Sequence, residues 1–186
     1  MATTDKSTVI SNFDPNGVGV SGQLFGLPFS TEEAEMIIIP VPWEVTVSYS
    51  EGTANGPQAI LQASAQVDLF QEDIPEAWKM GISMLPEDEE LRSASEKQRL
   101  LAEVYIQWLE AGEPEEVREQ FEKYPEGINA ACESMVDWVY KQSKIHLEKG
   151  KLVGLLGGDH STPLGLIKAM ADTHNSFGIL QIDAHA

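Results

Sequence analysis

Two groups of acidic and imidazole side chains stand out in this sequence, and each follows an apolar run. Asp-His at residues 159–160 follows the run 152–156, and Asp-Ala-His at residues 183–185 follows the run 177–182. Each run is typical of a buried strand in a parallel sheet. The carboxyl ends of such strands meet at one edge, where open α/β sheets bind their ligands. The two groups are therefore expected to share one site.

The residue types predict a metal site. Asp183 and His185 are two residues apart, so on an extended strand both side chains point to the same face. Burying an unpaired carboxylate is costly, and a divalent cation would offset that cost. Carboxylate and imidazole ligands favour manganese, nickel, iron or zinc over calcium or magnesium. With His160 from the neighbouring strand end, three metal ligands are predicted, and a solvated strand end is the alternative.

The residues beside His160 suggest how its ring is aimed. Gly157 and Gly158 permit a tight turn after the strand, because glycine adopts backbone conformations that other residues resist. Asp159 is predicted to orient an imidazole that binds the metal, with capping of the next helix as its alternative role. Ser161 is predicted to support the same site and to cap the helix that begins there.

Composition narrows the class of protein. The chain has 186 residues, which suits one domain, and its net charge is −18 from 30 acidic and 12 basic residues. This charge repels nucleic acids and anionic membranes, so neither is an expected partner, while it suits a small cationic substrate. The chain has a single cysteine, no signal-peptide pattern, and no apolar run near the ~20 residues of a membrane helix. A cytoplasmic location is expected.

Hydrophobic periodicity predicts alternating strands and helices after a polar N-terminal arm at residues 1–35. The predicted strands are residues 36–41, 152–156 and 177–182. The predicted helices begin near Pro57 and cover about 93–111, 115–124, 128–149 and 161–172. The apolar side expected for the helix at Pro57 consists of Ala59, Ile60, Ala63 and Val67.

Residues 85–127 are predicted to form an acidic helical insertion, with 13 Asp or Glu against 5 Lys or Arg. Ser93 and Glu96 resemble a capping box, which predicts the start of a helix. Apolar residues then recur at helical spacing: Leu100, Leu101, Val104, Trp108 and Leu109. The insertion is either a solvated surface feature or a contact for an oligomer or a docking partner. In the second case Trp108 and Phe121 are the expected anchors.

Taken together, three motifs resemble the ureohydrolases, the family of arginase and agmatinase. They are Gly-Gly-Asp-His-Ser at 157–161, Asp-Ala-His-Ala at 183–186, and Glu-Gly-Thr-Ala-Asn-Gly-Pro-Gln-Ala-Ile at 51–60, the last resembling the agmatinase-like branch. The resemblance implies a three-layer α/β/α fold with a central parallel sheet, incomplete in this chain. It makes residues 36–186 the N-terminal part of a single ureohydrolase domain.

The resemblance also implies a binuclear metal centre that holds two manganese or nickel ions. His160 would bind one metal, Asp183 would bridge both, and His185 would bind the other. A hydroxide held between the metals would attack a guanidinium carbon and release urea, so the expected protein is a hydrolase of linear amidines. Paired cations lower the pKa of a bridging water, which agrees with this role.

The sequence also departs from the family pattern. The third acid of the family's Asp-x-His-x-Asp motif would follow Ala186, and further ligands and substrate-binding groups lie later still. The 186-residue chain alone is therefore expected to be inactive. By resemblance, the partners of the protein are a guanidino substrate and further copies of itself, as a trimer or hexamer.

Guanidine is the expected substrate, giving urea and ammonia, because the arm and the acidic insertion resemble the guanidine hydrolase branch, in which nickel is associated with activity. Agmatine and 4-guanidinobutyrate are the alternative substrates. A catalytically idle scaffold subunit and a single-zinc deacetylase-like hydrolase are the alternative classes, and Gly-Gly-Asp-His-Ser argues against the second. Trp43 and Tyr49, in the loop after the first strand, are candidates for stacking on a flat cation, with ordinary packing as the alternative.

Overall fold

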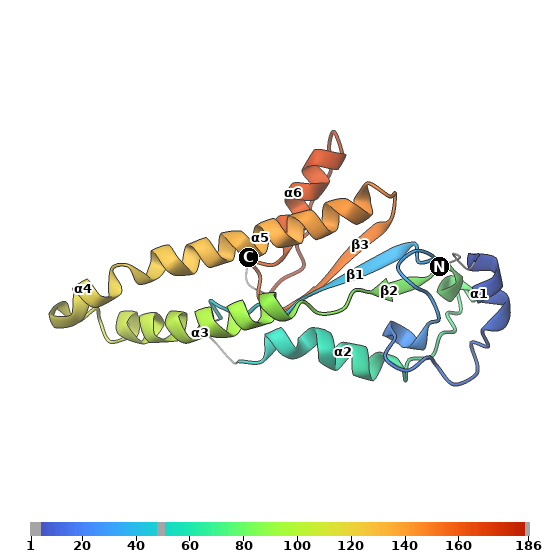
Figure 1. Ribbon diagram of the computed structural model, residues 1–186, viewed down its shortest axis with the longest axis horizontal. Helices are drawn as coiled ribbons and strands as arrows, with labels where there is room; N and C mark the ends of the chain where they lie inside the picture. Colours follow the sequence, from blue (N-terminus) through green and yellow to red (C-terminus); the bar gives the residue numbers. More distant parts are fainter. Residues whose placement is uncertain (1–4, 48–50, 185–186) are drawn as a thin grey trace.

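The structure, a computed structural model, describes residues 5–47 and 51–184. A three-stranded parallel sheet lies at its centre, in the order β2-β1-β3 (Figure 1). The central strand β1 spans Met36–Val41, between β2 at Ile82–Met84 and β3 at Leu152–Gly157. The predicted strands at 36–41 and 152–156 are confirmed, and β2 is a strand that the sequence did not predict.

Strand β1 is central because its side chains are apolar on both faces. Ile37, Ile39 and Val41 on one face are fully buried, as is Pro40 on the other face. β1 pairs with β3 in register from Met36 opposite Leu152 to Val41 opposite Gly157. The two strands therefore end at the same edge of the sheet, as parallel pairing requires.

Helices cover the two faces of the sheet. In Figure 1, α5 and α6 lie on one side of the strands and α2 on the other, which gives the expected α/β/α layering. The helices are α1 (Lys6–Asn12), α2 (Gly56–Ser64), α3 (Glu89–Glu110), α4 (Arg118–Phe121), α5 (Tyr124–Leu147) and α6 (Pro163–Thr173). Short 3-10 turns occur at η1 (Leu24–Gly26), η2 (Thr53–Asn55), η3 (Ala77–Met80) and η4 (Glu115–Val117).

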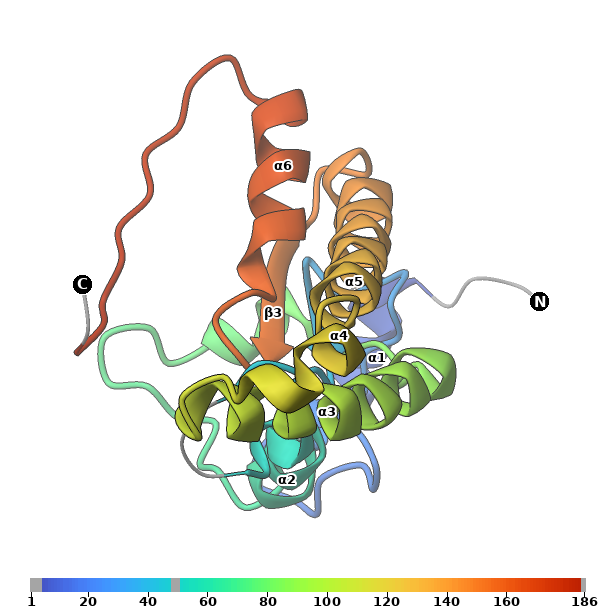
Figure 2. The same cartoon turned by 90° about the vertical axis from the view of Figure 1, so that its left-hand side faces the viewer.

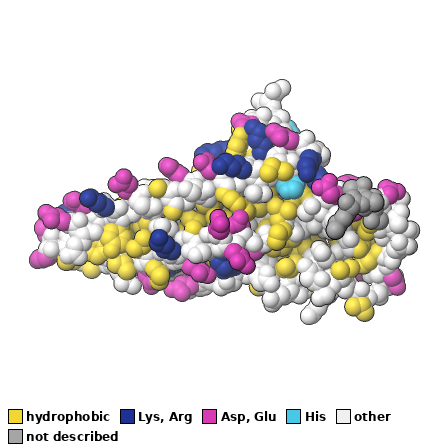
Figure 3. All heavy atoms as spheres, in the orientation of Figure 1, with side chains coloured by type: hydrophobic (Ala, Val, Ile, Leu, Met, Phe, Trp, Pro, Cys, Tyr) yellow, Lys and Arg dark blue, Asp and Glu magenta, His cyan; other side chains and the backbone are white. Residues whose placement is uncertain are grey.

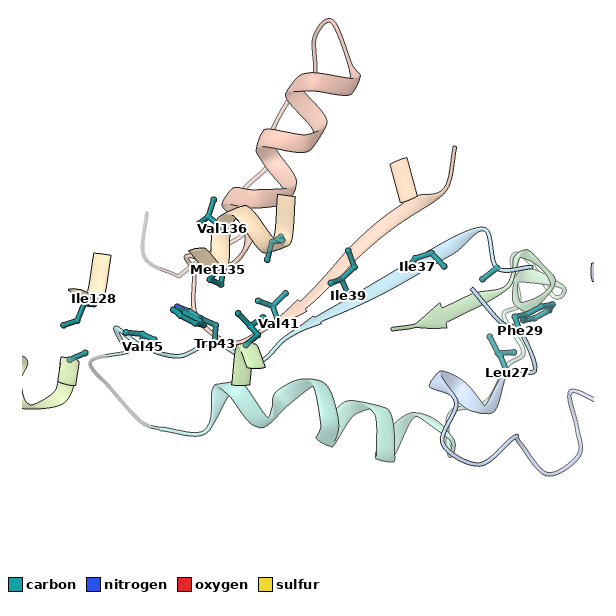
Figure 4. Close-up of a cluster of buried hydrophobic side chains, with 14 of the residues drawn as sticks. Leu27, Phe29, Ile37, Ile39, Val41, Trp43, Val45, Ile128, Met135 and Val136 are labelled. Carbon is teal, nitrogen blue, oxygen red and sulfur yellow. The ribbon is translucent and has the colours of Figure 1, made fainter. Parts of the chain in front are cut away.

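The buried core follows β1 from end to end. Figure 4 shows it running from Leu27 and Phe29, past β1, to Trp43, where side chains of α5 pack onto it. Met135 of α5 is 1% exposed. Helix α6 closes on α5 at Gly165, where a side-chain carbon would lie 2.5 Å from the carbonyl oxygen of Val136. The absence of a side chain there lets the two helices pack directly against each other.

The acidic insertion predicted at residues 85–127 is helical and projects from the sheet (Figure 1). We call this projection, and not the N-terminal segment, the arm. α3 and α5 form its two sides, and α4 lies at its tip. The rings of Trp108 and Phe121 stack at 5.2 Å, and Tyr124 lies 5.2 Å from Phe121. The two predicted anchors thus pack on each other inside the arm, and Trp108 is only 8% exposed.

Two details of the predicted helices are wrong. Helix α3 begins four residues before Ser93, because the Asp88 carboxylate accepts a hydrogen bond from the Leu91 amide at 2.8 Å and caps the helix there. In α2 the predicted apolar side faces solvent, and Ile60 is 45% exposed. The opposite side is buried, where the Ser64 hydroxyl accepts a hydrogen bond from the Phe25 amide at 2.9 Å.

The strand predicted at residues 177–182 is not formed in the part of the chain that the structure describes. Residues after α6 run as an extended segment beside that helix and away from the strands (Figure 2). Ile179, Leu180 and Ile182 are 66%, 86% and 91% exposed. A strand that is apolar on both faces is stable in a parallel sheet only when both faces are covered, and no described element covers this one.

No helix within residues 5–47 and 51–184 combines the length and the apolar character needed to cross a membrane.

One buried histidine predicts how stability depends on pH. His146 of α5 is 7% exposed, and its Nδ1 atom has no hydrogen-bond partner. Burial, together with the ammonium groups of Lys149 and Lys151, lowers the pKa of His146, and the carboxylate of Glu32 opposes that shift. The unfolded chain therefore takes up a proton, near pH 6.5, that the folded chain resists.

We expect the free energy of unfolding to show no loss from His146 above about pH 6.5. It should decrease as the pH falls from about 6.5 through the folded-state pKa of His146. Urea denaturation between about pH 5 and pH 8 measures it. A His146→Gln variant should lose less stability over this range than the parent chain. His174→Gln, at an exposed histidine, is the control and should behave like the parent. Parallel curves for the parent and His146→Gln would contradict the assignment.

Candidate active site

The Gly-Gly-Asp-His turn after β3 is closed by hydrogen bonds around Asp159. The Asp159 amide donates to the carbonyl oxygen of Trp43 at 2.9 Å, which ties the turn to the end of β1. The Asp159 carboxylate accepts from the Ser161 amide at 3.0 Å and from the Ser161 hydroxyl. The Thr162 hydroxyl donates to the Asp159 carbonyl at 3.0 Å. α6 then begins at Pro163, one residue later than a Ser161 cap predicts.

The second carboxylate oxygen of Asp159 makes no such bond. Asp159 Oδ2 is buried without a hydrogen-bond partner. A buried carboxylate oxygen is costly unless a donor or a cation satisfies it. The predicted role for Asp159, orienting an imidazole that holds a metal, would supply that donor. In the described part of the chain the alternative role, capping the helix, is not seen: the Asp159 carboxylate bonds only to Ser161, and α6, which begins at Pro163, has no side-chain cap.

Two predicted ligands that are far apart in the sequence lie together. His160 Nδ1 is 3.2 Å from Asp183 Oδ2. The Asp183 side chain is 11% exposed and also accepts a hydrogen bond from Gln181 Nε2 at 3.1 Å, while the His160 ring is 84% exposed. His160 and Asp183 therefore lie together at the carboxyl end of β3, although residues 177–182 do not form a strand.

The donor set fits a divalent transition metal. An imidazole nitrogen and a carboxylate oxygen at hydrogen-bond distance can both bind one ion once the proton between them is lost. His185, the third predicted ligand, lies outside the described residues, as does Tyr49. Among residues 5–47 and 51–184 there is no group of three or more His, Cys, Asp or Glu side chains able to hold a metal. The metal roles of His160, Asp183 and His185 stay predictions.

The pair opens onto a hollow of about 520 Å³ between β3, α6 and the final segment. Leu155 and Ile167 form part of its apolar lining, and Asp159, His160 and Asp183 form part of its polar lining. A concave site of this size, mostly apolar with a few convergent polar groups, is typical of small-molecule binding.

Trp43 occupies the core beside this site. Its side chain is 1% exposed, and its Nε1 atom is buried without a hydrogen-bond partner. This position matches the packing alternative, and stacking of Trp43 on a substrate stays untested. Burial, together with the nearby Asp159 carboxylate, raises the pKa of the thiol of the half-buried Cys132, so this side chain is neutral near pH 7.

Glu44 is a residue of the site region that the sequence reading missed. Its carboxylate accepts hydrogen bonds from the amides of Gly52 at 2.9 Å and Ala54 at 3.0 Å and from the Thr53 hydroxyl at 3.0 Å. Burial alone would raise the pKa of Glu44, but these three bonds outweigh it and lower the pKa. An acid in the loop between a predicted strand and a Gly-Thr turn is the signal that could have found it.

The loop that Glu44 holds lies against the Gly-Gly turn. A side-chain carbon at Gly56, where α2 begins, would lie 3.7 Å from the carbonyl oxygen of Gly157. The described parts of all three motifs, residues 51–60, 157–161 and 183–184, therefore gather at the carboxyl edge of the sheet.

Comparison with known proteins identifies the class. The model of the arginase family matches residues 34–186, so this chain belongs to the arginase family. The chain is 30% identical over 155 residues to an N(1)-aminopropylagmatine ureohydrolase of Thermus thermophilus, covering 83% of this chain and 41% of that protein. It is 26% identical over 159 residues to the Synechocystis protein of the same name, covering 84% of this chain and 41% of that protein. The search for similar solved structures gave no significant match.

These matches confirm the predicted family and an incomplete arginase-like α/β fold. The chain spans 41% of the length of the curated relatives that it matches.

The contact between the turn and β1 predicts the effect of one substitution. In Gly158→Ala, the new side-chain carbon would lie 1.9 Å from the carbonyl oxygen of Trp43, a backbone atom that cannot rotate away. We expect the free energy of unfolding, measured in urea, to decrease by about 1–3 kcal/mol, as for other overpacked sites. The Asp159 amide resonance should also move, because its bond to Trp43 would be displaced.

Gly127→Ala is the matched control, since no atom lies within 4 Å of the position that its side chain would occupy. It lies inside α5, where alanine favours the helix. Equal stability of the Gly158→Ala and Gly127→Ala chains would show that the close approach is not required.

The hydrogen bonds that Glu44 accepts predict the effect of a second substitution. Glu44→Ala leaves two amides without their acceptor and should cost about 1–3 kcal/mol of unfolding free energy at neutral pH. Glu44→Gln should cost less, because its amide oxygen still accepts. Since the folded-state pKa is lowered, the contribution of Glu44 is present above about pH 4.5 and is lost as the pH falls through the folded-state pKa.

Chemical denaturation of the parent and the two variants at several pH values measures this. Glu51→Ala, an exposed acid in the same loop, is the control and should unfold like the parent. If Glu44→Ala were as stable as Glu51→Ala, the carboxylate would not hold the loop.

Proposed function

We propose that this chain supplies part of a binuclear metal site that hydrolyses a guanidino C–N bond and releases urea. The approach of His160 Nδ1 to Asp183 Oδ2, at 3.2 Å, is the observation that carries the proposal. Membership of the arginase family supports it, as do the relatives named N(1)-aminopropylagmatine ureohydrolase. In this proposal His160, Asp183 and His185 would hold the metals.

The metal pair, when bound, supplies a nucleophilic hydroxide and a Lewis acid near neutral pH. The residues of this chain do the positioning. Asp183 brings negative charge into a position that is 11% exposed, where it attracts cations with little screening by water. Asp159, fixed through Trp43 and Ser161, has a buried oxygen with which to orient an imidazole.

The apolar part of the hollow would act on the substrate. Leu155 and Ile167 exclude water from one wall of it. A guanidinium is a weak electrophile that water attacks slowly. A dry wall beside a charged cluster would hold the flat cation against the nucleophile instead of in solvent. The net charge of −18 favours such a cationic substrate.

For the substrate, guanidine remains our proposal, with urea and ammonia as products and nickel or manganese as the metal. The extended N-terminal segment at 1–35 and the acidic insertion are the features that support it. N(1)-aminopropylagmatine, named in the curated relatives, is the second candidate, with agmatine and 4-guanidinobutyrate behind it. We further propose a cytoplasmic homo-oligomer, either trimer or hexamer.

The expected activity depends on length. We propose that residues 1–186 alone do not turn over, because they include at most three of the metal ligands implied by the family pattern. A catalytically idle scaffold subunit is the remaining alternative of another class.

The test measures metal content and urea release for residues 1–186 and for the protein at the length of its relatives. After loading with manganese or nickel, each is offered guanidine, agmatine, N(1)-aminopropylagmatine, arginine and 4-guanidinobutyrate. The longer form should bind two metals and release urea from one compound. His160→Ala and Asp183→Asn should each lower the rate by more than about a hundredfold, because losing a ligand removes the metal.

His174→Ala is the control, since this exposed histidine lies outside the site, and it should keep full activity. Bound metal without urea from any compound would rule out this substrate class. Neither metal nor urea at the longer length would favour the scaffold.

A further inference from the structure

Helix α3 carries an apolar stripe that no described element covers. Leu100, Leu101 and Val104 lie on one side of the helix and are 66%, 38% and 44% exposed. Trp108, which follows on the same side, is instead buried in the aromatic cluster of the tip. Figure 3 shows hydrophobic side chains along the arm with acidic side chains around them. Adjacent exposed apolar residues on one helix face often mark an interaction surface.

An acidic row runs beside this stripe. Glu89, Glu96, Glu103 and Glu110 recur every seven residues along α3 and therefore lie in line on the helix. Helical geometry places this row next to Leu100, which lies four residues after Glu96 and three before Glu103. Lys97, four residues before Leu101 and seven before Val104, lies in line with the stripe at its end nearest the sheet. An apolar seam with a line of like charge at one side is the arrangement that selects a partner helix by charge.

A hollow adjoins the stripe at its end nearest the sheet. It has a volume of about 270 Å³, and its lining includes Leu100 and Ser95 of α3 and Pro42 beyond β1. Its charged lining residues are the acids Glu44 and Glu96 and the bases Arg92 and Arg99. A single large apolar side chain of a partner fits such a cavity, in the way that anchor residues fill pockets at protein interfaces.

We propose that this face of α3 docks a basic amphipathic helix of another protein. The leucines and valine of the stripe would pack against the apolar side of that helix. Its lysine or arginine side chains would lie along the row of glutamates. The proposal concerns the outer face of the arm and does not depend on the proposed chemistry.

A second copy of this chain is the less favourable occupant. Two α3 helices packed antiparallel through the stripe would bring their glutamate rows together, which like charges oppose. The chain also carries a net charge of −18, so two copies repel each other at low salt. Complementary charge therefore selects a basic partner.

The test uses the 186-residue chain and a synthetic helical probe of about 20 residues, three heptads long, with leucines on its apolar side and lysines on both flanks. A matched probe carries glutamates in place of the lysines. Fluorescence anisotropy measures affinity, and amide resonances locate the probe on the chain. The lysine probe should bind at least about tenfold more tightly, and the resonances of α3 should move.

Two variants separate the apolar and ionic contributions. Leu100→Ser with Val104→Ser should weaken binding by about tenfold, whereas Ile60→Ser, at an exposed apolar position of α2, should not. Glu96→Gln, Glu103→Gln and Glu110→Gln together should weaken binding and reduce its salt dependence. The matched control neutralises three glutamates of the arm tip: Glu116, Glu119 and Glu122. All these changes are on the surface, and circular dichroism checks that α3 remains folded.

Three outcomes would overturn the proposal. One is failure of the lysine probe to bind. Another is equal weakening by the triple substitution at the arm tip and the triple substitution in α3, which would mean that net charge alone attracts the probe. The third is a concentration-dependent dimer that Leu100→Ser with Val104→Ser abolishes, which would assign the face to a second copy.

Discussion

The hydrogen bond from the Asp159 amide to the Trp43 carbonyl, at 2.9 Å, is the contact on which the rest of the site depends. It joins the end of β1 to the turn after β3, at a separation that only glycine at position 158 permits. On one side of this contact, the Trp43 ring is sealed into the core. On the other side, Asp159 shapes the turn that presents His160 and starts α6. A single backbone contact thus connects the packing of the sheet to the placement of an imidazole.

Sequence patterns predicted the parts of the fold that local apolar runs determine. The run at 36–41 is a largely buried strand, and the run at 152–156 pairs with it residue by residue, although its side chains are only half-buried and Leu152 is exposed. The run at 177–182 has the same composition, but a strand also needs cover on both faces, and composition does not reveal what lies above it. The reversed face of α2 has a similar origin. Its orientation follows from the bond between Ser64 and the Phe25 amide, a long-range contact that periodicity does not contain.

The candidate site likewise has features that the sequence predicted and features that it did not. The predicted approach of His160 to Asp183 is present, but not for the predicted reason, because Asp183 is carried by an extended segment that is not a strand of the sheet. Glu44 was missed because its role is to accept hydrogen bonds from the backbone, and any residues could supply those amides. Trp43 was considered for its ring, whereas its carbonyl oxygen makes the contact that matters. Backbone groups carry no identity in a sequence, so interactions built on them become visible only in three dimensions.

The arm has a consequence for how this protein can diversify. Its outer part is closed by its own rings, Trp108, Phe121 and Tyr124, and does not rely on the sheet for burial. Its inner part is anchored at Ser95, whose hydroxyl accepts from the Glu44 amide at 3.1 Å. Beyond that anchor, whole helical turns can be added, removed or resurfaced while the strand ends stay where they are. Such a segment can acquire or lose partners over evolutionary time without retuning the chemistry at the edge of the sheet.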